Sequence, residues 1–301
     1  MKFSAWPGLA GPWDEYLDLC RYLEHSGWDG LWVADHFMPS REDNTGPTGE
    51  AWTTLTALAT LVPRLRLGTL VVGNTYRHPA IVAKMAAQVD IISGGRLVLG
   101  LGAGWQRNEH EAYGIPFYTV GERLRRLRES AQIVKSLFAQ ERTTFAGRYY
   151  TVTDAPLAPK PLQRPGPPLL IGGGGEQVTL KIAARFADEW NVWGTPETLA
   201  QKGAILDRYC ADINRDPSEI RHLAQALLTL SDDEAVVQRA REARGQAAIA
   251  GNTQQVIEIV ERYREAGVDE LIIPDWTLGR GARAKEAYDR FREEVAANFR
   301  D

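Results

Sequence analysis

An aspartate–histidine pair, Asp35-His36, follows a short apolar segment near the start of the chain. An imidazole can give or take a proton near neutral pH, and a carboxylate beside it can hydrogen-bond a polar ring edge. The following residues, 39–50, are rich in Pro, Asn, Thr and Gly, a composition typical of a loop that covers a substrate. The pair predicts a proton-transfer site beside a ligand. The alternative is a structural pair that braces the loop.

Four consecutive glycines, Gly172, Gly173, Gly174 and Gly175, join another apolar segment to a helical pattern. Backbone N–H groups at such a junction can surround an anion, and the helix dipole adds to the attraction. Glycine loses more backbone entropy on folding than other residues, so a purely structural run would be costly. No Lys-Ser/Thr pair follows, which argues against a P-loop. The run therefore predicts a phosphate site.

Two further segments could approach a ligand with their backbone. Gly73 permits a close approach, and Asn74 offers both a donor and an acceptor. The alternating glycines of residues 100–105 would let a flat ligand lie against the main chain. Each segment could equally be an ordinary loop or tight turn.

Four of the nine tryptophans fall at or just past the ends of apolar segments: Trp6, Trp105, Trp193 and Trp276. Indoles gathered in one place would suit a planar ring system and an apolar substrate. Core packing is the alternative interpretation.

Metal chemistry and serine hydrolysis find little support. The histidines, at positions 25, 36, 78, 110 and 222, show no H-E-x-x-H spacing, and no C-x-x-C or G-x-S-x-G motif occurs. Glu109, His110 and Glu111 lie within one helical turn and are interpreted as a polar helix face. We therefore expect no metal site.

The elements that must position these residues alternate along the chain. Short apolar strands are predicted at 2–6, 30–34, 65–72, 96–101, 169–172, 189–193, 220–230 and 270–274. Helices are predicted at about 14–26, 51–62, 79–92, 120–139, 176–186, 196–213, 253–266 and 282–298. Strands that are each followed by a helix pair in parallel. The sequence thus predicts an α/β fold, a single (β/α)8 TIM-type barrel, whose active site lies at the C-terminal ends of its strands.

Two insertions interrupt the alternation, at about 140–168, with a hairpin and six prolines, and at 231–251, polar and rich in alanine. Because the alternation resumes after each, residues 1–301 are expected to form one domain. An open dinucleotide-binding sheet is the competing architecture, but no G-x-G-x-x-G follows the first strand.

Composition is that of an ordinary globular protein, with 44% hydrophobic and 25% charged residues. The net charge of −4 gives no indication of nucleic-acid binding. No segment has the length of a membrane span or the apolar core of a signal peptide, so a cytoplasmic protein is expected. Cys20 and Cys210 do not suggest a disulfide framework. Helices bordering the insertions could pair in a homodimer.

The sequence resembles the luciferase-like monooxygenase superfamily, and particularly its deazaflavin (coenzyme F420)-dependent oxidoreductases. The resemblance covers nearly the whole chain, and its most specific segments are 73–79, 93–96, 101–105, 109–114, 171–176 and 184–191. It implies a TIM-like barrel with the tricyclic cofactor ring in its mouth.

The resemblance also implies roles for individual residues. Asp35 and His36 would contact the ring region, with His36 catalytic, and a non-prolyl cis peptide near Gly73-Asn74 would support the back of the ring. The cofactor would further be lined by Ala103, Gly104, Trp105 and Asn108, and its phosphate would be received by Gly172, Gly173, Gly174 and Gly175. Sugar-phosphate dehydrogenases of this group carry a catalytic acid where this chain has Trp105, which favours a more apolar or conjugated substrate.

Three hypotheses follow for the function. The first is hydride transfer between F420 and a small organic substrate. The second is an FMN-dependent monooxygenase that uses reduced flavin and O2, and the third is a non-catalytic flavin-binding barrel.

Overall fold

The computed structural model describes residues 1–41, 43–244 and 248–300. Residue 42 of the expected 39–50 loop, residues 245–247 of the expected 231–251 insertion and residue 301 lie outside the described residues. Within the described part, no helix is both long and apolar enough to cross a membrane.

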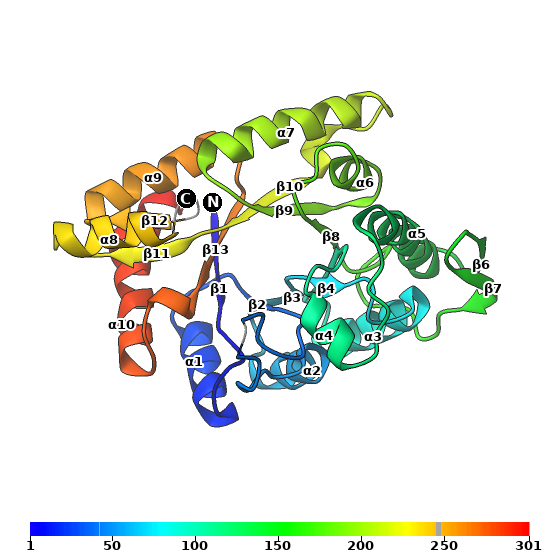
Figure 1. The fold of residues 1–301 in the computed structure, drawn as a ribbon, viewed down its shortest axis with the longest axis horizontal. Helices are drawn as coiled ribbons and strands as arrows, with labels where there is room; N and C mark the ends of the chain where they lie inside the picture. Colours follow the sequence, from blue (N-terminus) through cyan, green and yellow to red (C-terminus); the bar gives the residue numbers. More distant parts are fainter. Residues whose placement is uncertain (42, 245–247, 301) are drawn as a thin grey trace.

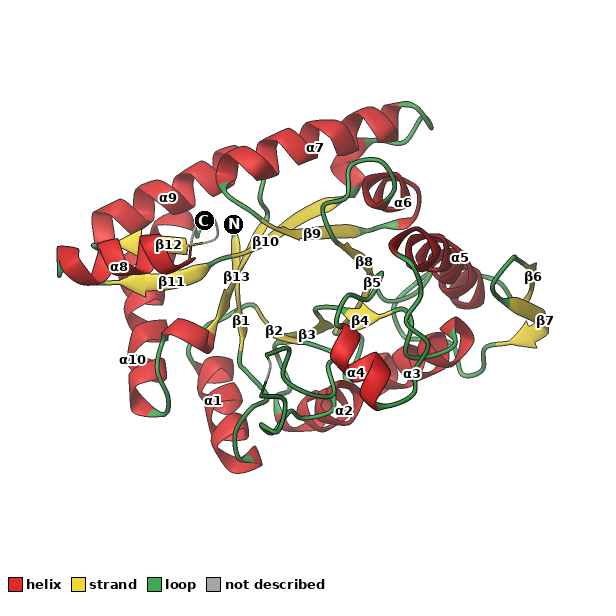
Figure 2. Cartoon of the chain, viewed as in Figure 1, coloured by secondary structure: helices red, strands yellow, loops and turns green. Residues whose placement is uncertain are grey.

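Eight parallel strands close into a barrel, as predicted (Figures 1 and 2). They are β1 (Lys2–Trp6), β2 (Gly30–Val33), β3 (Arg66–Thr69), β5 (Leu97–Gly102), β8 (Leu169–Gly172), β9 (Glu189–Trp193), β10 (Arg221–Gln225) and β13 (Glu270–Pro274). The sheet order is β3-β2-β1-β13-β10-β9-β8-β5, and pairing of β3 with β5 closes the ring. The C-terminal ends of all eight strands therefore meet at one mouth.

Helices surround the strands as an outer ring (Figure 2). They are α1 (Trp13–His25), α2 (Ala51–Leu61), α3 (Pro79–Ile92), α5 (Val120–Ala139), α6 (Thr179–Phe186), α7 (Pro196–Ala211), α9 (Thr253–Glu265) and α10 (Ala282–Arg290). Their first residues are set by local chemistry, since α3 and α7 begin with a proline and Asn252 forms a capping box with Gln255 at α9.

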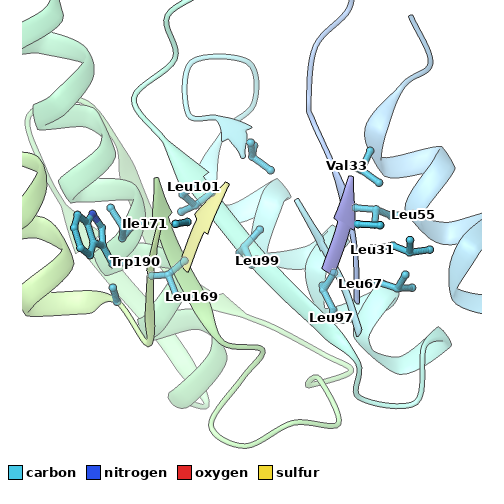
Figure 3. Close-up of a cluster of buried hydrophobic side chains, with 14 of the residues drawn as sticks. Leu31, Val33, Leu55, Leu67, Leu97, Leu99, Leu101, Leu169, Ile171 and Trp190 are labelled. Atoms are coloured by element: carbon cyan, nitrogen blue, oxygen red, sulfur yellow. The ribbon is translucent and has the colours of Figure 1, made fainter. Parts of the chain in front are cut away.

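Alternation of side chains along each strand separates two cores. Leu97, Leu99 and Leu101 of β5 point outward and pack, with side chains of β2, β3, β8 and β9, into the layer beneath the helices (Figure 3). The intervening residues point into the barrel, where Val98 joins a second apolar cluster. Its buried members are Trp6, Trp32, Leu70, Val98, Leu170, Leu223 and Ile272.

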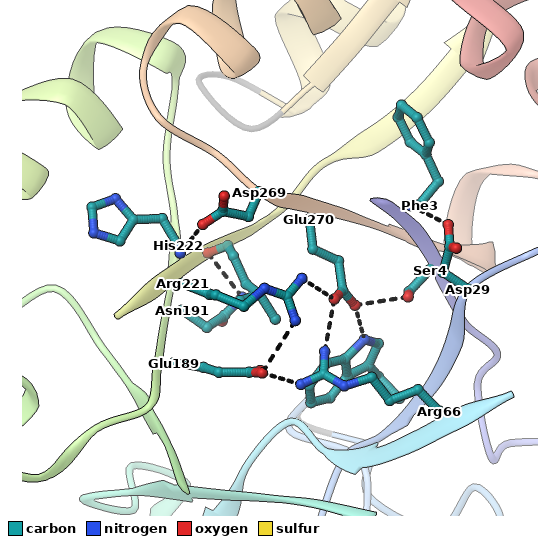
Figure 4. Close-up of polar contacts among 12 residues, drawn as sticks. Phe3, Ser4, Asp29, Arg66, Glu189, Asn191, Arg221, His222, Asp269 and Glu270 are labelled. Atoms are coloured by element: carbon teal, nitrogen blue, oxygen red, sulfur yellow. Dashed lines mark hydrogen bonds and ion pairs between the residues drawn. The ribbon is translucent and has the colours of Figure 1, made fainter. Parts of the chain in front are cut away.

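An ion cluster with two buried glutamates and two partly exposed arginines lies at the N-terminal end of the barrel. It consists of Arg66, Glu189, Arg221 and Glu270, each the first residue of its strand (Figure 4). We call these four residues the floor cluster. Burial raises the pKa of Glu189 above its ordinary value, against the opposing effect of the Arg66 guanidinium. Charges at this end are thus separated from the mouth by the apolar interior.

The structure divides two of the predicted strands. The strand predicted at 65–72 ends as β3 at Thr69 and resumes as β4 (Val72–Gly73), which pairs with the end of β5. The strand predicted at 220–230 is two strands in the structure. The first, β10, belongs to the barrel, whereas the second, β11 (Leu227–Leu230), lies outside the barrel and pairs with β12 (Ala248–Gly251).

The two insertions lie on opposite sides of the barrel (Figure 1). The first holds the predicted hairpin, β6 (Arg142–Ala146) and β7 (Thr151–Pro156), paired antiparallel. Among its described residues, the second is helical in α8 (Glu234–Arg244), and its last residues, predicted as helical, form β12. The predicted final helix ends at Arg290 and continues as a π turn (Phe291–Val295) and a 3-10 turn (Ala296–Phe299).

Candidate active site

His36 lies just past the end of β2 and is held by a buried carboxylate. Its Nδ1 is 2.8 Å from Oε1 of Glu109, whose side chain is 0% exposed, whereas the imidazole is 24% exposed. Nε2 of His36 has no hydrogen-bond partner within the described ranges. A ring held at one nitrogen and open at the other has a fixed orientation and one site for proton exchange.

Glu109 accepts two further hydrogen bonds. The backbone N–H of Phe37 donates to its Oε2 at 2.7 Å, and the Tyr76 hydroxyl donates to its Oε1. Burial opposes ionisation, but the hydrogen bonds from His36, Phe37 and Tyr76 outweigh it, so the pKa of Glu109 lies below its ordinary value. Glu109 is therefore an anion that fixes both His36 and the start of the following loop.

This arrangement corrects the interpretation of residues 109–111 as a polar helix face. Glu109 and His110 are both fully buried on the short helix α4 (Arg107–Ala112), and Glu111 alone pairs at the surface, with Arg107. One face of the helix is buried because it packs on the loop after β2, where the Asn108 side chain donates to the Pro39 carbonyl. The predicted cofactor residue Asn108 thus braces this loop.

Gly73 explains how Tyr76 reaches Glu109. A Cβ atom at position 73 would lie 2.2 Å from the Tyr76 ring, so any side chain there would displace the tyrosine. Asn74, the other residue predicted in this segment, is buried and its side chain lines a small internal cavity with Ser130 and Val134. Ser130 and Val134 belong to α5, so Asn74 lies against the helical layer.

The non-prolyl cis peptide joins Leu70 and Val71, so its expected position near Gly73-Asn74 is wrong by three residues. Val71, the second residue of this peptide, packs against two glycines. Methyl groups of Val71 occupy the space that a Cβ at Gly102 or Gly172 would need, with approaches of 2.6 and 2.9 Å. The glycine at 102 is thus required by Val71, which favours the tight-packing alternative for part of residues 100–105.

Asp35 is buried at the same strand end and pairs with a different element. Its Oδ2 accepts from Arg77 at 2.7 Å, and Arg77 also contacts Glu50 at 3.0 Å. Burial raises the pKa of Asp35 above its ordinary value, and the Arg77 charge opposes that rise. Oδ1 of Asp35 is buried and has no partner among the described residues, so it can still accept a hydrogen bond.

Ala103, Gly104 and Trp105 follow β5 on the same side of the mouth as His36. Ala103 is partly exposed, and Gly104 has a φ of +79° and accepts from Arg123 at 3.0 Å. Trp105 is 62% exposed and its indole meets the His36 ring edge-on, with centroids 5.4 Å apart. Trp105 therefore offers a large apolar surface next to the imidazole.

The glycine run offers backbone donors. Gly173 uses its N–H to reach the Asn191 carbonyl, but the N–H groups of Gly174, Gly175 and Glu176 find no acceptor in the described part of the chain. Lys202 lies beside them and donates to the Gly174 carbonyl at 2.8 Å. The helix that follows, α6, begins at Thr179 and not at residue 176 as predicted. The three N–H groups precede this helix, and together with Lys202 they can hold an anion.

Of the four tryptophans predicted to gather at the mouth, three meet one another, and Trp105 lies against His36 instead. Trp6, Trp193 and Trp276 have ring centroids 4.9 to 6.3 Å apart, and we call them the indole cluster. A groove of about 410 Å³ borders Trp276, between the β1–α1 and β13–α10 connections. The indole cluster provides an apolar wall.

No group of side chains that could ligate a metal occurs among the residues described.

Comparisons with known proteins bear on this arrangement. An F420-dependent glucose-6-phosphate dehydrogenase of Kineococcus radiotolerans is 38% identical over 173 residues, 57% of this chain and 50% of that enzyme. An F420-dependent hydroxymycolic acid dehydrogenase of Mycobacterium tuberculosis is 29% identical over 267 residues, 88% of this chain and 72% of that enzyme. The chain thus spans about half the length of the first of these relatives.

Among solved structures, an F420-dependent secondary alcohol dehydrogenase in complex with an F420–acetone adduct has a TM-score of 0.86, with 100% of both chains covered. Its sequence is 21% identical, so this likeness concerns the fold. The luciferase-like monooxygenase family matches residues 1–247, which include His36, Glu109 and the glycine run. The chain therefore belongs to the luciferase-like monooxygenase family.

Proposed function

We propose that this protein is an F420-dependent oxidoreductase that transfers a hydride between the cofactor and a small, mainly apolar organic substrate. The observation that carries the proposal is the imidazole of His36, held at Nδ1 by buried Glu109 and open at Nε2. The relatives named above are F420-dependent dehydrogenases, which favours F420 over FMN.

The chain has unpaired groups that suit such a cofactor. The N–H groups of Gly174, Gly175 and Glu176 would bind its phosphate, with Gly172 and Gly173 shaping the approach. Asp35 would accept a hydrogen bond through Oδ1 at the ring edge, and Val71 with Ala103 would lie against the ring. When bound, F420 supplies a two-electron hydride acceptor or donor.

His36 would move the proton that accompanies the hydride. In the oxidation of an alcohol to a carbonyl compound, Nε2 of His36 would accept the hydroxyl proton, and F420, when bound, would supply the acceptor for the hydride that leaves the same carbon. In the reverse direction the imidazolium returns the proton to the oxygen. Glu109 stabilises the charged imidazole in either direction because it is an adjacent anion.

A cofactor titration tests the proposal. We expect F420 to bind the purified protein with micromolar or lower Kd, measured by quenching of tryptophan fluorescence, and FMN to bind at least tenfold more weakly. Binding of FMN without F420 would instead favour the flavin monooxygenase, and binding of F420 without turnover of any alcohol, ketone or enone would favour a non-catalytic barrel.

Replacing Glu109 with glutamine should lower kcat by about 10- to 100-fold with little change in KM. The glutamine has one side-chain oxygen, which can accept from His36. It lacks the second oxygen that Glu109 needs to accept from the Phe37 N–H as well as from the Tyr76 hydroxyl. Steady-state kinetics on the best substrate measure the effect. Glu111→Gln, on the exposed side of the same helix, is the control. An unchanged kcat in Glu109→Gln would remove its positioning role.

A further inference from the structure

The last residue of β10 places an unpaired carboxamide inside the barrel. Arg221 belongs to the floor cluster and Leu223 to the interior apolar cluster, so by alternation Gln225 also points inward, at the end nearest the mouth. Gln225 is 3% exposed, and its Oε1 is buried without a hydrogen-bond partner in the described ranges.

Nothing in the strand itself requires this amide. The backbone of β10 is already paired, with Gln225 opposite Trp193 on β9 and Ile272 on β13, and the N–H of Ala226 donates to the Ile272 carbonyl. A buried polar atom that lacks a partner costs about 1–3 kcal/mol, and a leucine would fill a similar volume without that cost. The amide is therefore unfavourable for folding alone.

The surroundings indicate what could pair with it. Trp193, directly opposite Gln225, belongs to the indole cluster, while Leu223 and Ile272 form the apolar layer toward the barrel floor. The sheet order β2-β1-β13-β10 puts Gln225 three strands from His36. A carboxamide turns about its last bond, so it can present either its oxygen or its nitrogen to a ligand.

We propose that Gln225 is a specificity-determining residue that hydrogen-bonds a hydroxyl, carbonyl or amide group at the far end of an otherwise apolar substrate. This inference rests on the proposed function, because it assumes that the substrate binds at the barrel mouth. It narrows the substrate class to molecules with two oxygen- or nitrogen-bearing groups, one at the reacting carbon near His36 and one against the indole cluster.

Two small probes test the inference without the cofactor. Cyclohexanone carries one carbonyl group, and 1,4-cyclohexanedione carries a second at the opposite end of the ring. In ligand-observed NMR titrations we expect the wild-type apoprotein to bind the dione about tenfold more tightly, the ratio expected for one hydrogen bond. In Gln225→Leu this preference should fall to about the statistical factor of two for a symmetric ligand.

Gln201→Leu, at an exposed position of α7, is the matched control and should keep the wild-type preference. Thermal unfolding supplies a second measurement, because Gln225→Leu should keep or raise Tm if the amide has no structural partner. A tenfold preference that persists in Gln225→Leu, its absence in the wild type, or a lower Tm for Gln225→Leu would each overturn the inference. Failure of the proposed function would appear separately, as lack of F420 binding by a protein that still prefers the dione.

Discussion

Replacing His36 with alanine is expected to lower kcat by about 10²- to 10⁴-fold, the range typical of a lost general acid–base group. Hydride transfer to or from an alcohol carbon requires a proton to leave or reach the adjacent oxygen. Nε2 of His36 is open for that proton, and Nδ1 is held by Glu109, so the ring needs no reorientation during the reaction. Without the imidazole, water would have to serve instead, in an orientation that nothing fixes.

The measurement is single-turnover absorbance of F420 with the best substrate from a panel of secondary alcohols, ketones and enones. We expect the Kd for F420 to change by only a few-fold in His36→Ala, because the backbone N–H groups of Gly174 and Gly175, the proposed phosphate donors, are untouched. His25→Ala is the matched control, since His25 is exposed at the end of α1 and its Nδ1 hydrogen-bonds the Arg21 carbonyl of the same helix. Wild-type turnover by His36→Ala would refute the assignment of His36 as the catalytic residue.

The barrel could be predicted because its signal is local. Leu97, Leu99 and Leu101 alternate with inward-facing residues, and the helical segments between strands show their own spacing, so element type and order follow from the sequence. The rule that strand ends share one mouth then brings His36 and the glycine run to the same side. Both parts of the candidate site that follow a strand directly can be predicted in this way.

The partner of His36 could not be predicted because its signal is not local. Glu109 is 73 residues away in the chain, and a single turn of polar residues does not reveal which side is buried. The tertiary contact with Phe37 and Tyr76 decides that Glu109 faces inward. The proposed role of Gln225 could not be predicted for a related reason: segment 220–230 has the pattern of one strand, and the departure of β11 toward β12 makes Gln225 a strand end.

Substitutions in the floor cluster are expected to change the stability of the barrel strongly. Glu270 is fully buried and accepts from Ser4 Oγ at 2.7 Å, Trp32 Nε1 at 3.0 Å and Arg66 at 2.7 Å (Figure 4). Arg221 approaches it at 3.3 Å. With Glu189, the floor cluster has two positive and two negative side chains, so each charge is compensated within the barrel.

Glu270→Ala is expected to lower the free energy of unfolding by about 3 kcal/mol, because the partly exposed guanidinium groups of Arg66 and Arg221 then share a single carboxylate, that of Glu189. Ser4 and Trp32 lose their acceptor in the same step. Urea denaturation followed by tryptophan fluorescence measures the loss, and Glu261→Ala, on an outer helix, is a control expected to change little. Should Glu270→Ala not accumulate as folded protein, Glu270→Gln keeps the shape and should still lose about 1–3 kcal/mol.

A double variant separates the charge from the packing. Arg66→Met combined with Glu270→Leu removes one charge of each sign, so the cluster remains neutral while the volume is largely kept. Because a buried ion pair often contributes little relative to an apolar pair of similar size, the double variant should lose less stability than the sum of the two single variants. If the double variant loses as much free energy of unfolding as the two single variants together, the floor cluster stabilises the barrel through separate contacts. Its charge balance would then contribute nothing to stability.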